Sequence, residues 1–289
     1  MPPITPPRNI ETPSGKDTAY ENFPVGSWLL PAELRPEVAI FYAFARAADD
    51  IADNPDLGPD DKVARLDAFE DALLGADLES PGLGKSHDMR DSLARTGVTA
   101  KHCADLLAAF KQDATQHRYR DWDDLVAYCR LSAASVGRYM LDLHGGSRDG
   151  YAPSDALCMA LQIINHLQDC REDYRRLDRV YLPQDWMDET GAAVEDLDAP
   201  TTGPALAEVF RRTLAGVEGL LEEASSIPAG LRSRRLSMES AAILKIAWRL
   251  TGLLRRGDPL AGRIQLSKAG YVWCCILGVL SAGLRGPSS

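Results

Sequence analysis

Two stretches of the chain place acidic residues at the spacing of one helix face. In the segment VAIFYAFARAADDIAD, residues 38–53, the polar side chains are Tyr42, Arg46, Asp49 and Asp53. At about 100° per residue these positions fall within about 60° of one another. A helix over this segment therefore carries a tyrosine, an arginine and two carboxylates as one stripe.

A second stripe occurs in DALCMALQIINHLQDCREDYRRLDRVY, residues 155–181. Its members are Gln162, Asn165, Asp169 and Asp173, which lie among apolar residues. Carboxylates on a mainly apolar helix are costly to bury unless a cation lies between them. The segment therefore predicts a polar site on a helix that is otherwise built for the protein core.

The two stripes together favour a Mg²⁺ site over ordinary solvated helix faces. A single Asp-x-x-x-Asp is common on exposed helices, where arginines four residues away serve as partners. Both stripes here begin with neutral or cationic groups and end in carboxylates. Facing each other, they would form an all-oxygen cage for Mg²⁺, which completes its coordination with water and phosphate oxygens. Mg²⁺ on a diphosphate makes it a leaving group, which is ionisation chemistry without a protein nucleophile.

The elements that carry these stripes are predicted to be helices throughout. Apolar residues recur with a period of 3.6, convincing alternating strands are lacking, and no linker or repeat divides the chain. We therefore expect an all-α, single-domain protein, with residues 1–16 as a disordered tail and the domain over 17–285. The predicted helices are Val38–Ile51, Lys62–Leu74, Ala100–His117, Trp122–Leu143, Asp155–Leu177, Pro204–Ala224, Leu231–Leu254 and Leu266–Leu280.

Composition excludes several classes of protein. The net charge of −10 repels nucleic acid, so no nucleic-acid partner is expected. The six cysteines lack zinc-finger spacing and are typical of reduced thiols in the cytoplasm. The apolar run Tyr271–Gly283 has 13 residues, which is short of the roughly 20 that span a bilayer, and it predicts a buried terminal helix.

The paired motifs resemble those of the squalene/phytoene synthase family of head-to-head prenyl synthases. The first reads Tyr42-x-x-x-Arg46-x-x-Asp49-Asp50-x-x-Asp53. The second reads Gln162-x-x-Asn165-x-x-x-Asp169-x-x-Glu172-Asp173 and is followed by Arg179-Val180-Tyr181-Leu182-Pro183. The resemblance implies an isoprenoid-synthase helical bundle around a deep apolar cavity.

The resemblance also implies roles for individual residues. Asp49, Asp53, Asp169 and Asp173 would be the catalytic carboxylates that, with Asn165, hold two or three Mg²⁺ ions. The substrate-binding residues would be Tyr42, Arg46, Gln162, Phe23 and Glu172.

One segment is similar to a bacterial branch of this family that acts on presqualene diphosphate in the hopanoid pathway. Many family members carry His-Ser-x-Ser-Phe where this chain has Glu21-Asn22-Phe23-Pro24. An acidic residue there disfavours a second diphosphate. The resemblance therefore implies ionisation of presqualene diphosphate, capture of the cation by water, and release of hydroxysqualene and diphosphate.

Two other interpretations remain open. The chain could condense two prenyl diphosphates, such as farnesyl diphosphate, as a squalene, presqualene diphosphate or phytoene-type synthase. It could also be a non-catalytic helical assembly factor, although every motif carboxylate is present.

NADPH is not expected as a cofactor, since no Gly-x-Gly-x-x-Gly follows a strand. Transient contact with sister pathway enzymes and with the inner membrane is expected, because the substrate and product are apolar.

Two smaller features are interpreted as structural. Gly84-Lys85-Ser86 resembles the end of a phosphate-binding loop, but Glu79 stands where the first glycine is required, so a plain loop is predicted. His166 lies one residue from Asn165, about 100° away from the stripe, and is interpreted as a packing or surface residue.

Overall fold

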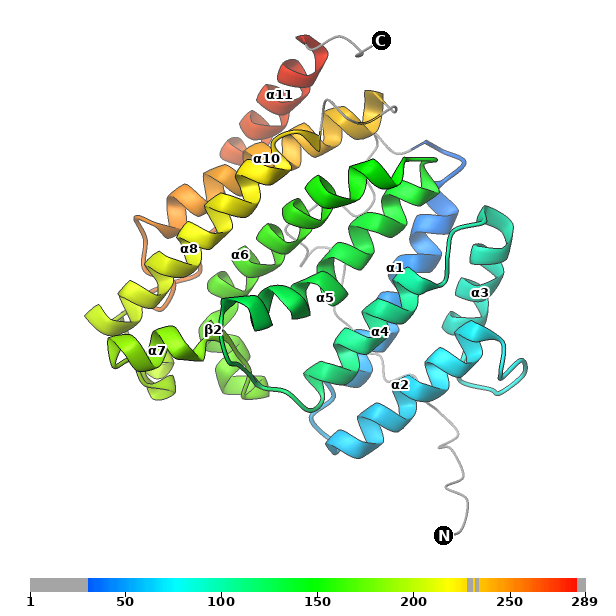
Figure 1. Cartoon of the computed structure of the whole chain (residues 1–289), viewed down its shortest axis with the longest axis horizontal. Coiled ribbons are helices and arrows are strands. Elements are labelled where there is room, and N and C mark those ends of the chain that lie inside the picture. Colours follow the sequence, from blue (N-terminus) through cyan, green and yellow to red (C-terminus); the bar gives the residue numbers. More distant parts are fainter. Residues whose placement is uncertain (1–30, 228–230, 232–233, 285–289) are drawn as a thin grey trace. The chain divides into compact units, whose positions relative to one another are not determined.

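The computed structural model describes residues 31–227, 231 and 234–284 (Figure 1). The chain divides into two compact units, Met1–Thr115 and Gln116–Ser289, and each is described by itself. Helices make up most of both units, which confirms the all-α prediction. The predicted domain over 17–285 begins and ends outside the described residues and stays a prediction.

The first unit is built from helices whose ends are fixed by proline and glycine. Pro59 occupies the first turn of its helix, where a missing N–H costs nothing, and Gly75 and Gly97 end two helices in the left-handed conformation. Phe44 and Phe69 are fully buried and meet at 6.0 Å between ring centroids. The helices are α1 (Arg35–Ala52), α2 (Pro59–Leu74), α3 (Gly84–Thr96) and α4 (Lys101–Asp113).

Helix α3 corrects one prediction. The Gly84-Lys85-Ser86 segment is the first turn of α3 and not a loop. The Ser86 side chain is buried and donates a hydrogen bond of 2.5 Å to the carbonyl oxygen of Phe69. The segment therefore ties α3 to α2 and has a structural role.

The second unit centres on the long helix α6, against which α5 and α8 pack (Figure 1). α6 begins four residues before the predicted start, because Pro153 is tolerated in a first turn. Its helices are α5 (Trp122–Leu143), α6 (Tyr151–Leu177), α7 (Gln184–Thr190), α8 (Pro204–Ala224), α10 (Arg234–Leu254) and α11 (Lys268–Leu284), with short 3-10 turns at Arg148–Gly150 and Val194–Asp198.

A glycine allows α5 to approach α6 closely. A Cβ atom at Gly137 would lie 2.6 Å from the Cys158 sulfur and 2.7 Å from the Ser154 hydroxyl. Real Cβ atoms do not come that close to neighbouring atoms, so a larger residue would push the helices apart. Nearby on the same two helices, Arg138 holds Asp155 through both nitrogens of its fork.

A short parallel strand pair joins the segment before α5 to the segment after α6, and the expectation of a chain without strands is therefore wrong. β1 (Arg118–Tyr119) pairs with β2 (Val180–Pro183), with Arg118 opposite Val180. Asp178 ends α6 in the left-handed conformation, at φ 53°, and its side chain accepts a 2.6 Å hydrogen bond from Arg118. This pairing holds Tyr181 buried on β2, where it contacts α6.

Candidate functional site

The first stripe lies on α1 and is linked by Arg46. The Arg46 guanidinium donates hydrogen bonds to the Asp49 carboxylate at 2.8 Å and to the Tyr42 hydroxyl at 3.3 Å. The side chains of Arg46 and Asp49 are 21% and 34% exposed. Asp53 caps the helix C-terminus, and its backbone N–H bonds to the Asp49 carbonyl. Tyr42, Arg46 and Asp49 thus form one half-buried group on α1, and Asp53 follows, also half-buried, at the end of the helix.

The second stripe lies on α6 and is joined by an arginine from far along the chain. Arg263 contacts both oxygens of Asp169, at 3.1 and 3.2 Å. Burial raises the pKa of the Asp169 carboxyl, Arg263 opposes the rise, and the negative charges of Asp173 and Glu172 add to it. Negative charge is therefore concentrated at this end of α6.

The loop between α10 and α11 brings Arg263 to this position. Asp258 accepts hydrogen bonds from the backbone N–H of Thr202 and of Leu260, both at 2.9 Å. Gln168 of α6 donates to the carbonyl oxygen of Ile264, at 2.5 Å. These contacts anchor the loop on both sides of Arg263, so the ion pair with Asp169 is held by the fold.

A pocket of about 430 Å³ opens beside the second stripe. Asp169 and Glu172 line it together with Arg263 and three arginines of α6. Of these three, Arg171 donates to the carbonyls of Leu197 and Ala199, and Arg176 pairs with Glu172 at 2.9 Å. The pocket is therefore lined by both carboxylates and guanidinium groups, which suits an anion carried by a metal ion. The lining residues are Gln168, Asp169, Arg171, Glu172, Arg175, Arg176 and the loop 259–263.

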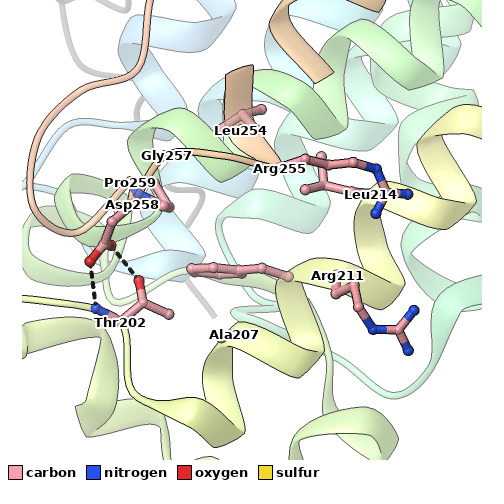
Figure 2. Close-up of a pocket in the computed structure, with 10 residues that line it drawn as sticks. Thr202, Ala207, Arg211, Leu214, Leu254, Arg255, Gly257, Asp258 and Pro259 are labelled. Carbon is pink, nitrogen blue, oxygen red and sulfur yellow. Dashed lines mark hydrogen bonds between the residues drawn. The ribbon is translucent and has the colours of Figure 1, made fainter. Parts of the chain in front are cut away.

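A second pocket, shown in Figure 2, has a structural explanation. It measures about 260 Å³ and lies between α8 and the start of the same loop. Its two arginines are paired, Arg211 with Glu208 and Arg255 with Glu218. At its other end Asp258 holds Thr202 (Figure 2). This pocket therefore contributes to loop anchoring.

His166 is a buried packing residue, as interpreted, but it lies on the same helix face as the second stripe, so its expected separation from the stripe is wrong. One ring nitrogen, Nε2, lies 3.1 Å from the Gln162 amide nitrogen, and the other, Nδ1, lies 3.8 Å from an Asp173 oxygen. The ring is buried and stacks on Tyr181 at 3.5 Å between centroids and 12° between planes. The spacing of His166 could have predicted this position. It lies four residues after Gln162 and seven before Asp173, which places all three on the same helix face.

The remaining predicted site residues are placed as follows. Asn165 is half-buried on α6. Glu172 is exposed and paired with Arg176. Phe23 and the Glu21–Pro24 segment lie outside the described residues.

The donor atoms of both stripes fit Mg²⁺. They are carboxylate and amide oxygens, which hard divalent cations prefer, and the accumulated negative charge around Asp169 is what a bound cation relieves. Each stripe by itself contributes two motif carboxylates. Among the described residues, no three or more His, Cys, Asp or Glu side chains gather as one metal-binding group.

An all-α fold with a carboxylate stripe on each of two helices defines a helical isoprenoid-synthase type of protein. The structure of squalene synthase HpnC from Alicyclobacillus acidocaldarius superposes with a TM-score of 0.73 at 29% identity, over 82% of this chain and 89% of that one. A dehydrosqualene synthase structure shares the fold, with a TM-score of 0.73 at 22% identity over 89% of each chain.

The sequence model of the squalene/phytoene synthase family matches residues 17–270, and the chain belongs to that family. The hydroxysqualene synthase of Rhodopseudomonas palustris is 43% identical over 262 residues, which are 91% of this chain and 89% of the relative. That of Zymomonas mobilis is 41% identical, over 89% of this chain and 86% of the relative. The family resemblance carried by the two motifs is therefore confirmed. Enzymes of this family ionise prenyl diphosphates with divalent metal ions.

Proposed function

We propose that this chain is a hydroxysqualene synthase that converts presqualene diphosphate and water to hydroxysqualene and diphosphate. The observation that carries the proposal is the 43% identity to a hydroxysqualene synthase over nearly the full length of both proteins. Two further hydroxysqualene synthases match at 40% and 41% identity. Phytoene synthases match less well, at 34% identity over 60% of this chain for that of Mycobacterium tuberculosis.

The carboxylates of the two stripes would hold the metal ions. The proposed Mg²⁺ ligands are Asp49, Asp53, Asn165, Asp169 and Asp173. Bound Mg²⁺ supplies positive charge to the diphosphate, which makes it a better leaving group. The half-buried positions of the stripes strengthen this interaction, because charges attract more strongly away from bulk water.

Arg46 and Arg263 would bind diphosphate oxygens and balance the carboxylates. Each already holds a motif aspartate, Asp49 at 2.8 Å and Asp169 at 3.1 Å. The fork of a guanidinium presents several donors, so it can hold a carboxylate and a phosphate oxygen together. Tyr42 would donate its hydroxyl to the same anion, and Glu172 and Phe23 complete the proposed substrate-binding set.

His166 would orient Gln162 toward the diphosphate. The Gln162 amide nitrogen can only donate, so the ring nitrogen Nε2 that it meets is the acceptor. The ring proton then lies on Nδ1, which faces the Asp173 carboxylate. His166 therefore connects a proposed substrate-binding residue with a proposed metal ligand, while Tyr181 fixes the plane of its ring.

The reaction balances without a reductant. The carbon–oxygen bond to diphosphate breaks, and its electron pair leaves with the diphosphate. A water oxygen then bonds to the rearranged carbocation and loses one proton to the medium. The net consumption is one water, so NADPH is not required.

Product analysis tests the proposal against the condensing alternative. The purified chain is incubated with presqualene diphosphate or with farnesyl diphosphate, in Mg²⁺ or EDTA, with and without NADPH. We expect hydroxysqualene from presqualene diphosphate in Mg²⁺ alone. Efficient consumption of farnesyl diphosphate would instead favour a squalene or phytoene-type synthase, which the name of the Alicyclobacillus acidocaldarius structure also raises.

A further inference from the structure

Helix α11 carries a continuous apolar face that is exposed. Trp273 and Leu280 are 60% and 57% exposed. At about 100° per residue, the apolar side chains fall within an arc of about 140°. The helix was predicted to be buried, and this face shows that it is not. The exposed residues of this apolar face are Val272, Trp273, Ile276, Leu277 and Leu280.

The opposite side of α11 fixes this orientation. Cys274 is buried against α10, and a Cβ atom at Gly278 would lie 2.3 Å from the Cα atom of Ala242. Such a close approach between helix backbones leaves no room to turn α11 about its axis. Farther along the same side, burial raises the pKa of the Tyr271 phenol, and the negative charge of Glu239 on α10 adds to the rise. The apolar face therefore points outward because α10 occupies the other side.

Cations border the apolar face on α10. Lys245 and Arg249 are exposed. Burial raises the pKa of the Cys274 thiol on α11, and the positive charges of these two residues oppose the rise, so both lie near α11. Trp248, which lies between them in the sequence, is also exposed. Lys268 begins α11 and is exposed. The face thus combines apolar side chains and exposed tryptophans with a cationic border.

We propose that the apolar face of α11, with its cationic border on α10, docks onto an anionic lipid bilayer. A helix with apolar side chains on its outward face and cations beside it lies in the plane of the headgroups, with the apolar residues in the acyl boundary. Tryptophan is favoured at that depth because its ring is apolar and its N–H is polar. No helix among the described residues is long and apolar enough to cross a bilayer.

Charge favours a bilayer over a second copy of the chain as the occupant. Pairing two such faces would bring Lys245 and Arg249 of one copy toward the same cations of the other. An anionic surface attracts those cations and repels the rest of a chain whose net charge is −10. We therefore expect this face, and not another part of the surface, to contact the bilayer.

Vesicle flotation with the full chain tests the proposal without substrate, so its outcome is independent of the proposed reaction. Vesicles of phosphatidylcholine alone are compared with vesicles of equal parts phosphatidylcholine and phosphatidylglycerol. We expect binding to the anionic vesicles, at least a tenfold loss of partitioning for Leu280→Glu, and a partial loss for Arg249→Glu. The matched control is Leu78→Glu, because Leu78 is 62% exposed in the other unit and its variant should bind like the wild type.

Three outcomes would overturn the proposal. The first is a wild-type chain that binds neither kind of vesicle. The second is a Leu280→Glu variant that binds as well as the wild type. The third is a wild-type dimer in solution that Leu280→Glu converts to monomer without any vesicle binding, which would assign the face to a second copy. Circular dichroism and melting temperature check that the variants are folded.

Discussion

Replacing His166 by phenylalanine separates its two contacts. Phenylalanine keeps a flat ring that can stack on Tyr181, where the imidazole now lies at 3.5 Å. It removes Nε2, the partner of the Gln162 amide at 3.1 Å, and Nδ1, which faces Asp173 at 3.8 Å. The variant therefore tests orientation of Gln162 while the packing stays.

The magnitude follows from one lost hydrogen bond. One hydrogen bond makes a net contribution of about 0.5–1.5 kcal/mol to the free energy of unfolding. The 3.8 Å contact between His166 and Asp173 is too long to be a second hydrogen bond. We expect His166→Phe to lower the free energy of unfolding by about 1 kcal/mol or less. If Gln162 is oriented through His166, kcat/KM should fall by roughly fivefold, which corresponds to about 1 kcal/mol. His166→Ala, which also loses the ring, should cost about 3 kcal/mol of stability.

The assay is a double-mutant cycle with Gln162→Ala, read by steady-state kinetics and by urea unfolding. We expect a coupling of about 1 kcal/mol in kcat/KM between the two positions, and partial recovery in His166→Gln, whose amide can contact Gln162. Additive effects would refute the orienting role. A loss beyond a thousandfold in His166→Phe would instead place His166 in contact with the reacting atoms.

Three further predictions concern the helices, the metal and the thiols. Gly278→Ala should destabilise the protein by about 1–3 kcal/mol in urea unfolding, whereas Gly219→Ala, with open space around it, should raise stability by up to about 1 kcal/mol. Asp49→Asn should abolish turnover yet lower the melting temperature by no more than about 4 °C, since its ion pair is partly exposed; unfolding of the variant would mean a structural role. Burial raises the pKa of the Cys103 and Cys170 thiols to about 12, so iodoacetamide should modify them slowly at pH 8 and rapidly in denaturant; fast native labelling would contradict their burial.

Several of the helices were predictable because their patterns are local. The 3.6 period and the flanking proline and glycine place α2 and α8 with bounds close to those observed. α3 was not predicted, because its sequence GKSHDMRDSLART is mainly polar and shows little apolar period. β1 and β2 were not predicted either, since a two-residue strand paired with a four-residue one leaves no alternating pattern to detect.

The partners of the site residues were less predictable than the residues themselves. The Arg46 to Asp49 pair is local, at three residues apart, and the stripe includes both. The pairing of Arg263 with Asp169 joins residues 94 apart, so only tertiary structure reveals it. For the second stripe the sequence therefore suggested uncompensated carboxylates, whereas the fold provides it with the Arg263 guanidinium. The exposure of α11 was missed for a similar reason, because apolar composition does not tell which side has a neighbour.

Isotope labelling is the measurement that shows whether water captures the carbocation formed from presqualene diphosphate. The purified chain is incubated with presqualene diphosphate and Mg²⁺ in water enriched in oxygen-18, without NADPH, and the products are identified by mass spectrometry. We expect hydroxysqualene whose hydroxyl carries the heavy isotope, and no product when EDTA replaces Mg²⁺. Unlabelled hydroxysqualene, or squalene that forms only when NADPH is added, would contradict capture by water.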